Sequence, residues 1–530
     1  MPRRIQTVNG TEYVYDYVSK WDKEKKYSTS KREYIGKMVD GVFVPNKQYR
    51  LRMALEEAVR NNPPATTREE CSRSFCGATC LFDAIGEQAG VADDLRKCFP
   101  GTHKQILSLA YYLILEDRNP LSRFPRWAKT HNHPFGADIP SQRSSEIFGS
   151  IDEDAKQRFF RMQAKRRMEK EFLVYDTTSV SSYSKLIKQA KYGHNKEHDP
   201  LPQINLLLLY GEESRLPIYY RKLPGNIPDV VTVRKLLADI DFLRMSKVKL
   251  VMDKGFYSEK NVNELYRTHS KFLMAIRNSL KLVRGILDEE REKLTQRVFY
   301  DSEHEIYGLC RATTWQYSET MKRGSETRTG EKRIYFHLFR DEQKAVDERG
   351  RFNAMLDDLE QEIRSDERVP AHESLYAKYY DIKETPVRGI RLTPKHEAIE
   401  EAQKNFGCFV LISNGVKDSR EALRLYRAKD VIEKAFGNLK ERLNLRRTSV
   451  SSDENLDGKL FVQFIALTYL SQIDKVMRKN DLYKKYTLHE LLDEMDVIER
   501  FDYSGKRHHI GEVTEKQREL YRCFGVEAPT

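Results

Sequence analysis

The sequence contains no long hydrophobic run. The longest apolar stretches, INLLLL at 204–209 and the interrupted FVQFIALTYL at 461–470, are shorter than the roughly 20 residues that cross a membrane. The opening residues, MPRRIQTVNG, lack the apolar region of a secretory signal, and no internal repeat or long low-complexity tract is present. We therefore expect neither a membrane-spanning nor a secreted protein, and we expect 461–470 to form a helix buried against the central sheet.

Cysteine is sparse, with 7 in 530 residues, and the odd number predicts reduced thiols. Cys71, Cys76 and Cys80 form a Cys-x4-Cys-x3-Cys group, with Cys98 downstream. Zinc ribbons and fingers use other spacings, and no histidine accompanies this group. We therefore favour structural thiols over a zinc site.

A pair of histidines, His194-x3-His198, has the spacing of metal ligands on one turn of a helix. The surrounding sequence, GHNKEHDPLPQ, contains Gly and Pro residues that indicate a loop. We interpret this segment as a polar loop in the vicinity of DNA rather than as a metal site.

Positive charge is in excess. The chain has 92 Lys and Arg against 80 Asp and Glu, a net charge of +12 and a pI of about 9.0. This balance favours a polyanionic partner, although a basic ribosomal or membrane-surface protein would also show it. The segment KERLNLRR at 440–447 is locally basic and is either a DNA-facing surface or a solvated charged face.

Two aspartates lie in apolar segments that are typical of buried strands. Asp176 lies within EFLVYDTTSV, and Asp253 ends the run VKLVMD before a Lys-Gly turn. Desolvating an unpaired carboxylate costs much free energy, so a buried-strand aspartate is usually paired or bound to a metal. One such residue would be unremarkable, but two suggest a shared site.

A third acidic residue lies in an amphipathic helix predicted around YRAKDVIEKAFGNLK. Its pattern is Tyr-x2-Lys-x3-Glu-x6-Lys, formed by Tyr426, Lys429, Glu433 and Lys440. In one continuous α-helix these four side chains fall within roughly a 60° arc. A carboxylate held beside cations on a docked helix suits metal-dependent phosphate chemistry, whereas a solvated amphipathic helix is the alternative.

The order of elements between 170 and 445 predicts an α/β fold with a mixed sheet flanked by helices. We expect strands at 171–180, 203–210, 215–222, 248–253 and 271–276, and helices at 229–243 and 257–269.

This order, followed by a helix that carries Glu433, resembles the ribonuclease-H-like core of DDE transposases. The helix motif resembles the Tyr-x2-Arg-x3-Glu-x6-Lys signature of a group of bacterial insertion-sequence transposases, with Lys429 replacing Arg. The replacement keeps the positive charge but loses the planar guanidinium group, which can donate two parallel hydrogen bonds to one partner. Asp253-Lys-Gly-Phe similarly resembles that group's Asp-Arg-Gly-Phe, and Gly225-Asn226-x2-Asp229 resembles its Gly-Asn-x2-Asp turn. The resemblance covers about 140–525.

The resemblance implies that Asp176, Asp253 and Glu433 are the catalytic triad and hold two Mg²⁺ or Mn²⁺ ions. Hard oxygen ligands suit these ions, and two ions can activate a nucleophile and stabilise the leaving oxygen in a phosphodiester attack. Carboxylates clustered without metal should raise one another's pKa values, so we expect metal binding and folding of the site to be coupled.

The resemblance also implies double-stranded DNA as partner, both terminal inverted repeats and target DNA, with a homodimer holding two ends. The following residues are predicted to contact DNA: Tyr426, Lys429, Lys440, Lys254, Arg446 and Arg447. Trp315, in CRATTWQY, is a candidate for base stacking, although a packing role in a β subdomain is favoured.

We expect five regions in the chain. They are a small β-ribbon domain at 1–50 with a hairpin turn at Asp40-Gly41, a helical domain at 51–140, a ribonuclease-H-like catalytic core at 141–284 and 406–482, an insertion at 285–405, and a helical tail at 483–530. The insertion follows because the link from Asp253 to Glu433 far exceeds the about 4–6 residues of a usual connection. The helical domain is the first choice for recognising DNA ends; the ribbon could dock in a DNA groove or serve oligomerisation.

The function that these features favour is cut-and-paste movement of an insertion sequence by a cytoplasmic, nucleoid-associated bacterial transposase. Two alternatives are a ribonuclease-H-like nuclease that cuts without strand transfer and a domesticated DNA-binding protein without catalysis. Joined products from linear donor DNA and Mg²⁺ would distinguish the first alternative, and an Asp253→Ala variant with full biological effect would support the second.

Overall fold

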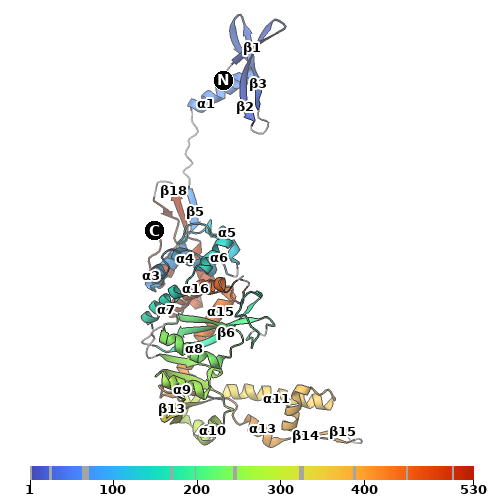
Figure 1. The fold of residues 1–530 in the computed structure, drawn as a ribbon, viewed down its shortest axis with the longest axis vertical. Helices are drawn as coiled ribbons and strands as arrows, with labels where there is room; N and C mark the ends of the chain where they lie inside the picture. Colours follow the sequence, from blue (N-terminus) through green and yellow to red (C-terminus); the bar gives the residue numbers. More distant parts are fainter. Residues whose placement is uncertain are drawn as a thin grey trace. The chain divides into compact units, whose positions relative to one another are not determined.

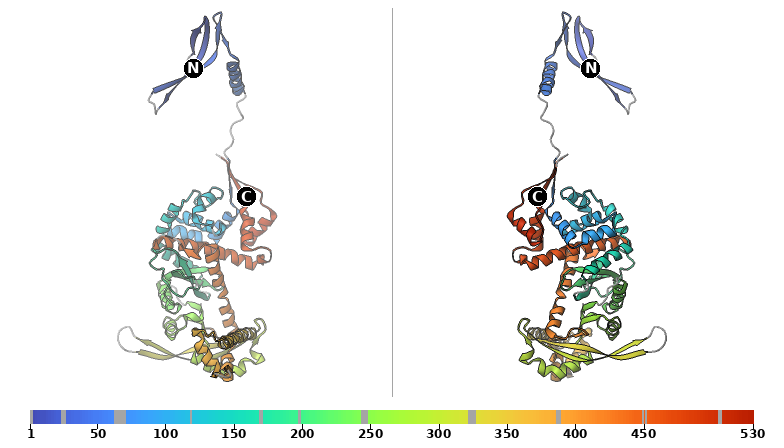
Figure 2. Two further views of the ribbon diagram at one scale, coloured as in Figure 1. Left: turned by 90° about the vertical axis from the view of Figure 1, so that its right-hand side faces the viewer. Right: turned by 90° about the vertical axis from the view of Figure 1, so that its left-hand side faces the viewer.

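The structure is a computed structural model that describes most of the chain. The described residues are 3–22, 27–61, 71–117, 119–167, 171–196, 199–242, 248–320, 327–385, 389–448, 450, 452–503 and 507–530. The chain forms two compact units, Met1–Ser72 with Phe501–His508 (unit 1) and Arg73–Arg500 with His509–Thr530 (unit 2) (Figures 1 and 2).

Unit 1 contains a four-stranded antiparallel sheet of order β1-β2-β3-β4. Its elements are β1 (Arg3–Val8), β2 (Thr11–Asp22), β3 (Tyr27–Val39), β4 (Val42–Pro45) and the helix α1 (Lys47–Asn61). Asn9-Gly10 and Asp40-Gly41 close the outer hairpins with positive φ at both residues, as two-residue turns require. The predicted turn at Asp40-Gly41 is confirmed, and α1 belongs to this unit.

Unit 2 is a mixed α/β structure built on a ten-stranded sheet of order β11-β12-β13-β16-β10-β9-β6-β7-β8, with β17 paired to β6. The strands are β6 (Leu173–Ser182), β7 (Gln203–Gly211), β8 (Pro217–Pro224), β9 (Lys249–Met252), β10 (Lys271–Ile276), β11 (Tyr300–Asp301), β12 (Ile306–Thr320), β13 (Thr327–Asp341), β16 (Cys408–Ser413) and β17 (Arg447–Thr448). The predicted α/β class is confirmed.

The centre of this sheet is formed by the strands predicted from sequence. β6 is antiparallel to β7, and β7 is antiparallel to β8, whereas β9 is parallel to both β6 and β10. Every residue of β7 is buried, which explains its unbroken apolar run. The predicted helices are α8 (Asp229–Phe242) and α9 (Glu259–Arg267), and they follow β8 and β9 in the chain.

The region predicted as an insertion, 285–405, has two parts. Its hairpin, β12 and β13, extends the central sheet because β13 pairs with β16, and β16 pairs with β10. The second part has its own small core, formed by Leu359, Ile363, Tyr376, Tyr379 and Tyr380. It comprises α11 (Glu342–Arg364), α12 (Glu373–Tyr379), β14 (Tyr380–Thr385), β15 (Gly389–Pro394) and α13 (His396–Gln403), and α10 (Lys281–Leu294) precedes the hairpin (Figure 1).

A long helix, α16 (Asp453–Lys479), organises the rest of unit 2. It contains the apolar run 461–470, all of it buried, and it packs on β8, so the predicted buried helix is confirmed. On other sides it contacts α2 (Gly77–Gln88), α4 (His103–Leu115) and α6 (Ser141–Gly149). The helical segment predicted at 51–140 is thus divided between the two units, since the largely buried α2 and α4 complete the core around α16.

The remaining elements connect or flank these parts of the chain. They are β5 (Cys71–Phe75), α3 (Val91–Cys98), α5 (Phe124–Ala128), α7 (Glu153–Arg167), α14 (Ser419–Arg427), α15 (Asp430–Gly437), α17 (Leu488–Asp496), β18 (Glu499–Tyr503), β19 (His509–Ile510) and α18 (Glu515–Cys523), with single turns at Leu121–Arg123, Lys254–Phe256, Arg297–Phe299, Pro370–His372, Asn438–Arg442 and Leu482–Lys484. A search of the described residues finds no helix with the length and apolar character that crossing a membrane requires.

The packing of α16 on α6 depends on Gly458. A Cβ at this position would lie 2.1 Å from the carbonyl oxygen of Phe148. We predict that Gly458→Ala lowers the free energy of unfolding by about 1–3 kcal/mol despite the better helix propensity of alanine. The measurement is the thermal melting of unit 2, with Gly285→Ala in α10 as control, because a Cβ there meets no atom within 4 Å. Equal melting temperatures of the two variants would contradict the prediction.

Candidate active site

Asp176 lies at the centre of the sheet. β6 is flanked by β9 and β7, and the side chain of Asp176 is 15% exposed. Its Oδ1 accepts a hydrogen bond from the backbone N–H of Thr177 at 2.8 Å. Burial raises the pKa of Asp176 above its ordinary value, and the nearby Asp253 acts in the same direction.

Asp253 follows the last residue of β9, the strand next to β6. It caps the turn Lys254–Phe256, and its Oδ1 accepts from the N–H of Lys254 at 2.8 Å and from the hydroxyl of Tyr426 at 2.9 Å. β6 and β9 are parallel and adjacent, so the sheet itself brings Asp176 and Asp253 together.

Glu433 reaches the same place from a broken helix. The continuous helix expected from Tyr426 to Lys440 is interrupted between α14 and α15, where Lys429 and Ile432 donate to carbonyls three residues back. It then widens into a π-helical turn at Asn438–Arg442 that holds Lys440. The expected 60° arc of side chains on a uniform α-helix is therefore wrong for this segment. Tyr426, Lys429 and Glu433 nevertheless lie at the same site.

The side chain of Lys429 lies among all three carboxylates. Its Nζ lies 3.4 Å from Asp253 Oδ2 and 3.2 Å from Glu433 Oε1. Asp253, Asp176 and Glu433 together raise the pKa of Lys429, more than offsetting the opposite effect of burial. The carboxylate oxygens of the triad do not all lie within 4.8 Å of one another, which matches an ammonium group between them.

This ammonium group changes the electrostatics that were expected. Burial would raise the pKa of Asp253, but Lys429, the amide of Lys254 and the hydroxyl of Tyr426 outweigh it, so the pKa lies below its ordinary value. The expected rise in pKa is therefore found for Asp176 but not for Asp253. The expectation that the clustered carboxylates raise one another's pKa values is therefore wrong for Asp253, because the charge of Lys429 lowers its pKa.

A second lysine approaches Asp176 from the loop between β6 and β7. Lys196 Nζ lies 3.7 Å from Asp176 Oδ1 and 3.7 Å from Asp229 Oδ2, and it donates to the carbonyl of Thr177 at 2.5 Å. The Thr177 hydroxyl donates to Asp229 Oδ1 at 2.5 Å. Sequence reasoning placed this polar loop in the vicinity of DNA but did not identify Lys196. His198, the second histidine of the predicted His194-x3-His198 pair, lies outside the described residues.

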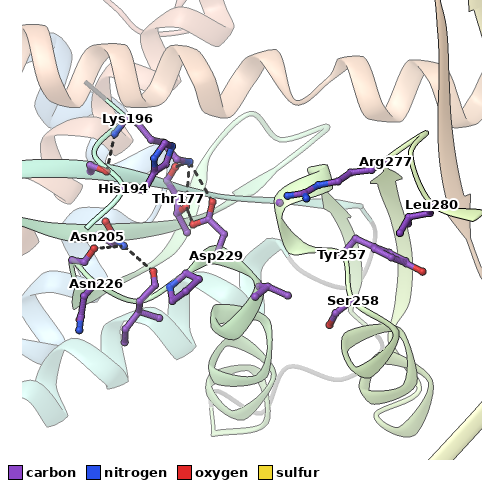
Figure 3. Close-up of a pocket in the computed structure, with 16 residues that line it drawn as sticks. Thr177, His194, Lys196, Asn205, Asn226, Asp229, Tyr257, Ser258, Arg277 and Leu280 are labelled. Carbon is purple, nitrogen blue, oxygen red and sulfur yellow. Dashed lines mark hydrogen bonds and ion pairs between the residues drawn. The ribbon is translucent and has the colours of Figure 1, made fainter. Parts of the chain in front are cut away.

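Thr177, Lys196 and Asp229 line one side of a cavity of about 560 Å³, and Lys196 connects its lining to Asp176. Figure 3 shows Thr177, Lys196 and Asp229 directed toward one another, with Tyr257 and Arg277 on the other side. Gly225, Asn226 and Asp229 of the predicted turn also line it. The cavity therefore joins the turn motif to the acidic site.

The other predicted contact residues differ in exposure and in their place on the sheet. Lys254 is exposed on the turn after Asp253. Arg446 directly precedes β17, the strand that pairs with the far end of β6. Arg447 Nε lies 3.0 Å from Asp199 Oδ2, and the same side chain donates to the hydroxyl of Tyr183.

Trp315 is 7% exposed on β12, and its indole N–H donates to Asn263 Oδ1 at 2.7 Å. This environment matches the packing role that sequence reasoning favoured. The cysteines are free thiols, with Cys76 and Cys98 buried and Cys71 exposed.

One further group has metal-ligand character. Within the described ranges, the ligand atoms of Asp301, Glu303 and His304 are the set of three that lie within 4.8 Å of one another. His304 Nδ1 lies 2.9 Å from Asp301 Oδ2, so this group is already internally bonded. It belongs to the segment before β12 and is separate from the triad in the chain.

Comparison with known proteins identifies the family. Residues 167–469, which contain all three acidic residues, match the family described as Transposase DDE domain. A cryo-EM structure of the piggyBac transposase synaptic complex with hairpin DNA shows 10% identity over 74% of this chain and 69% of that chain, with a TM-score of 0.33, too low to support an argument. A search of curated proteins found no match. Because the family match covers more than half of the chain, the protein belongs to the DDE transposases and is an enzyme of DNA transposition.

Proposed function

We propose that Asp176, Asp253 and Glu433 are the catalytic triad of this transposase. The observation that carries the proposal is that Asp253 and Glu433 both pair with the ammonium group of Lys429, while the parallel strands β6 and β9 bring Asp176 beside Asp253. Side-chain exposure increases from Asp176 (15%) through Asp253 (34%) to Glu433 (56%), so the site is open on the Glu433 side. A DNA backbone can approach from there.

We assign the central strands to a ribonuclease-H-like core. Three antiparallel strands, β6 to β8, are followed by α8, β9, α9 and β10, and later by the helix with Glu433. This is the order that the sequence resemblance implies. It supports a catalytic core at 141–284 and 406–482, with α11 to α13 as the protruding part of the insertion at 285–405.

The donor set fits a pair of hard divalent cations, Mg²⁺ or Mn²⁺. Three carboxylates supply oxygen ligands, with Asp176 deepest and the other two on the two sides of Lys429. When bound, such ions would activate the attacking hydroxyl or water and stabilise the leaving oxygen. The chain itself positions this site, because Tyr426 and the amide of Lys254 fix the carboxylate of Asp253.

The proposed reaction is end cleavage followed by strand transfer of a bacterial insertion sequence, by a homodimer that holds two terminal repeats. Tyr426, Lys429, Lys440, Lys254, Arg446 and Arg447 are the proposed contacts to DNA backbone. Lys429 would then exchange its carboxylate partners for phosphate as the cations bind.

Substitutions of the triad test the assignment. We predict that Asp176→Asn, Asp253→Asn and Glu433→Gln each lower Mg²⁺-dependent cleavage of donor DNA by at least about a hundredfold, because a charged ligand is lost at the reacting phosphate. Binding of DNA ends, measured by fluorescence anisotropy, should stay within a few-fold of the native protein.

The matched control is Asp430→Asn. Asp430 lies on the same helix as Glu433 but pairs with Lys434 instead of the triad. The Asp430→Asn variant should cleave and join linear donor DNA as the native protein does. Near-native cleavage by any triad variant would remove that residue from the site.

Lys429 provides a second test. We predict that Lys429→Met binds Mn²⁺ at least about tenfold more tightly, because a cation that competes for the same carboxylates has been removed. Isothermal titration of the DNA-free protein measures this, and Lys434→Met is the control for loss of one charge from the same helix. Unchanged or weaker Mn²⁺ binding would show that Lys429 does not occupy the charge site of the metals.

Lys440 tests the DNA-facing side of this helix. We predict that Lys440→Ala weakens binding to DNA ends and reduces the slope of log K against log salt by about 1, as loss of one phosphate contact does. A slope equal to that of the native protein would exclude Lys440 as a phosphate contact.

A further inference from the structure

The two faces of the unit 1 sheet differ in chemistry. One face packs against α1, where Arg52 NH2 lies 3.2 Å from Asp16 Oδ2 and Arg3 NH2 donates to the hydroxyl of Tyr49 at 2.6 Å. Val14 and Ile35 are buried on this side. The carboxylates of this face are therefore held by the arginines of the sheet and helix.

The opposite face, here called the open face, carries no helix among the described residues of unit 1. Strand register pairs Arg4 with Tyr15, Gln6 with Tyr13 and Tyr17 with Arg32 across the sheet. The charged, amide and aromatic members of the open face are Arg4, Gln6, Tyr13, Tyr15, Tyr17, Arg32, Tyr34 and Lys37, and the same alternation adds the exposed Val8, Val39 and Val42 at its edges. Its arginines, glutamine and lysine are exposed, whereas Tyr13, Tyr15 and Tyr17 are half-buried.

Contacts within the open face hold its long side chains in place. The guanidinium of Arg4 lies 5.3 Å from the ring centre of Tyr17, and that of Arg32 lies 5.8 Å from the ring centre of Tyr15. The rings of Tyr13 and Tyr15 each lie 5.7 Å from that of Tyr34. The guanidinium of Arg32 also donates to Gln6 Oε1 at 3.5 Å, a contact that DNA would have to replace. Guanidinium groups held on aromatic rings lose less entropy on binding.

The charge on the open face has one sign. It carries Arg4, Arg32 and Lys37, whereas alternation along the strands places Glu12, Asp16 and Glu33 on the helix side, so none of the described carboxylates of this sheet joins it. Residues 1–61 contain 13 Lys and Arg against 8 Asp and Glu. Such a face is complementary to a polyanion.

The dimensions of the open face fit a DNA groove. Three neighbouring strands, β1 to β3, span about 10 Å between their outer axes, and the major groove is about 12 Å wide. A register shift between Val14 and Tyr15 increases the local twist of the sheet, which helps it to follow a helical groove.

From these observations we infer that the open face of unit 1 is a second DNA-binding site, which docks in the major groove of duplex DNA and reads its sequence. The guanidinium groups of Arg4 and Arg32 can donate two hydrogen bonds to guanine O6 and N7. The amide of Gln6 can bind adenine N6 and N7 in the same way. The tyrosine hydroxyls suit phosphate and sugar oxygens at the groove edges. The site is independent of the triad, so either assignment can fail without the other.

The test uses the full-length chain and two duplexes of equal length, one with the terminal sequence of the element that encodes the chain and one of random sequence. Arg4→Ala and Arg32→Ala should each weaken binding to the terminal duplex about tenfold and reduce the salt slope by about 1. Arg4→Lys should keep the salt slope but lose preference for the terminal duplex. Lys47→Ala, which removes a charge from the first turn of α1, is the control and should bind as the native protein does.

Interference by guanine N7 methylation distinguishes the major groove from the minor groove. The native protein should be blocked by methylation of specific guanines, and Arg4→Ala or Arg32→Ala should each abolish one of these signals. The proposal would be overturned by native affinity in both alanine variants, by absence of N7 interference, or by a change in self-association of the variants without a change in DNA affinity.

Discussion

The proposed active site depends on the ammonium group of Lys429, which pairs with Asp253 and Glu433 and interacts electrostatically with Asp176. Asp176 and Asp253 are brought together by adjacent parallel strands, whereas Glu433 comes from a helix much later in the chain. Lys429 links these parts because its Nζ lies within 3.4 Å of both Asp253 and Glu433. Without this cation, three acidic groups in a partly buried site would repel one another.

The same constraint explains the irregular backbone around Lys429. The backbone N–H groups of Lys429 and Ile432 donate to carbonyl oxygens three residues earlier in the chain. These bonds lie where α14 ends and α15 begins. This break allows Tyr426 to donate to Asp253 while Glu433 extends to the more exposed side. Local departures from regular helix geometry are common at functional sites, and here the departure positions two groups that a straight helix would space differently.

Much of the fold could be predicted from sequence because the strands of the central sheet are strongly apolar. β6, β7, β9 and β10 lie within two or three residues of their predicted limits, and the buried helix at 461–470 is confirmed. The extension of the sheet by β12, β13 and β16 was not predicted, because pairing between segments far apart in the chain leaves no local signal. The division of 51–140 between two units also depends on tertiary packing.

The candidate site was predicted in part. The three acidic residues were identified from two apolar strands and one motif, whereas Lys196 was missed because it lies in a loop without periodicity. The proximity of Lys429 to Glu433 follows from their spacing of four residues, whereas the pairing of Lys429 with Asp253 could not be predicted, because it depends on the packing of this helix beside β9.

The most direct test of the account is the location of Mn²⁺ by anomalous X-ray diffraction from crystals of the protein bound to DNA ends. The account predicts anomalous peaks whose ligands include oxygens of Asp176, Asp253 and Glu433, with Lys429 displaced toward the DNA backbone. A peak at Asp301, Glu303 and His304 with none at the triad would contradict it.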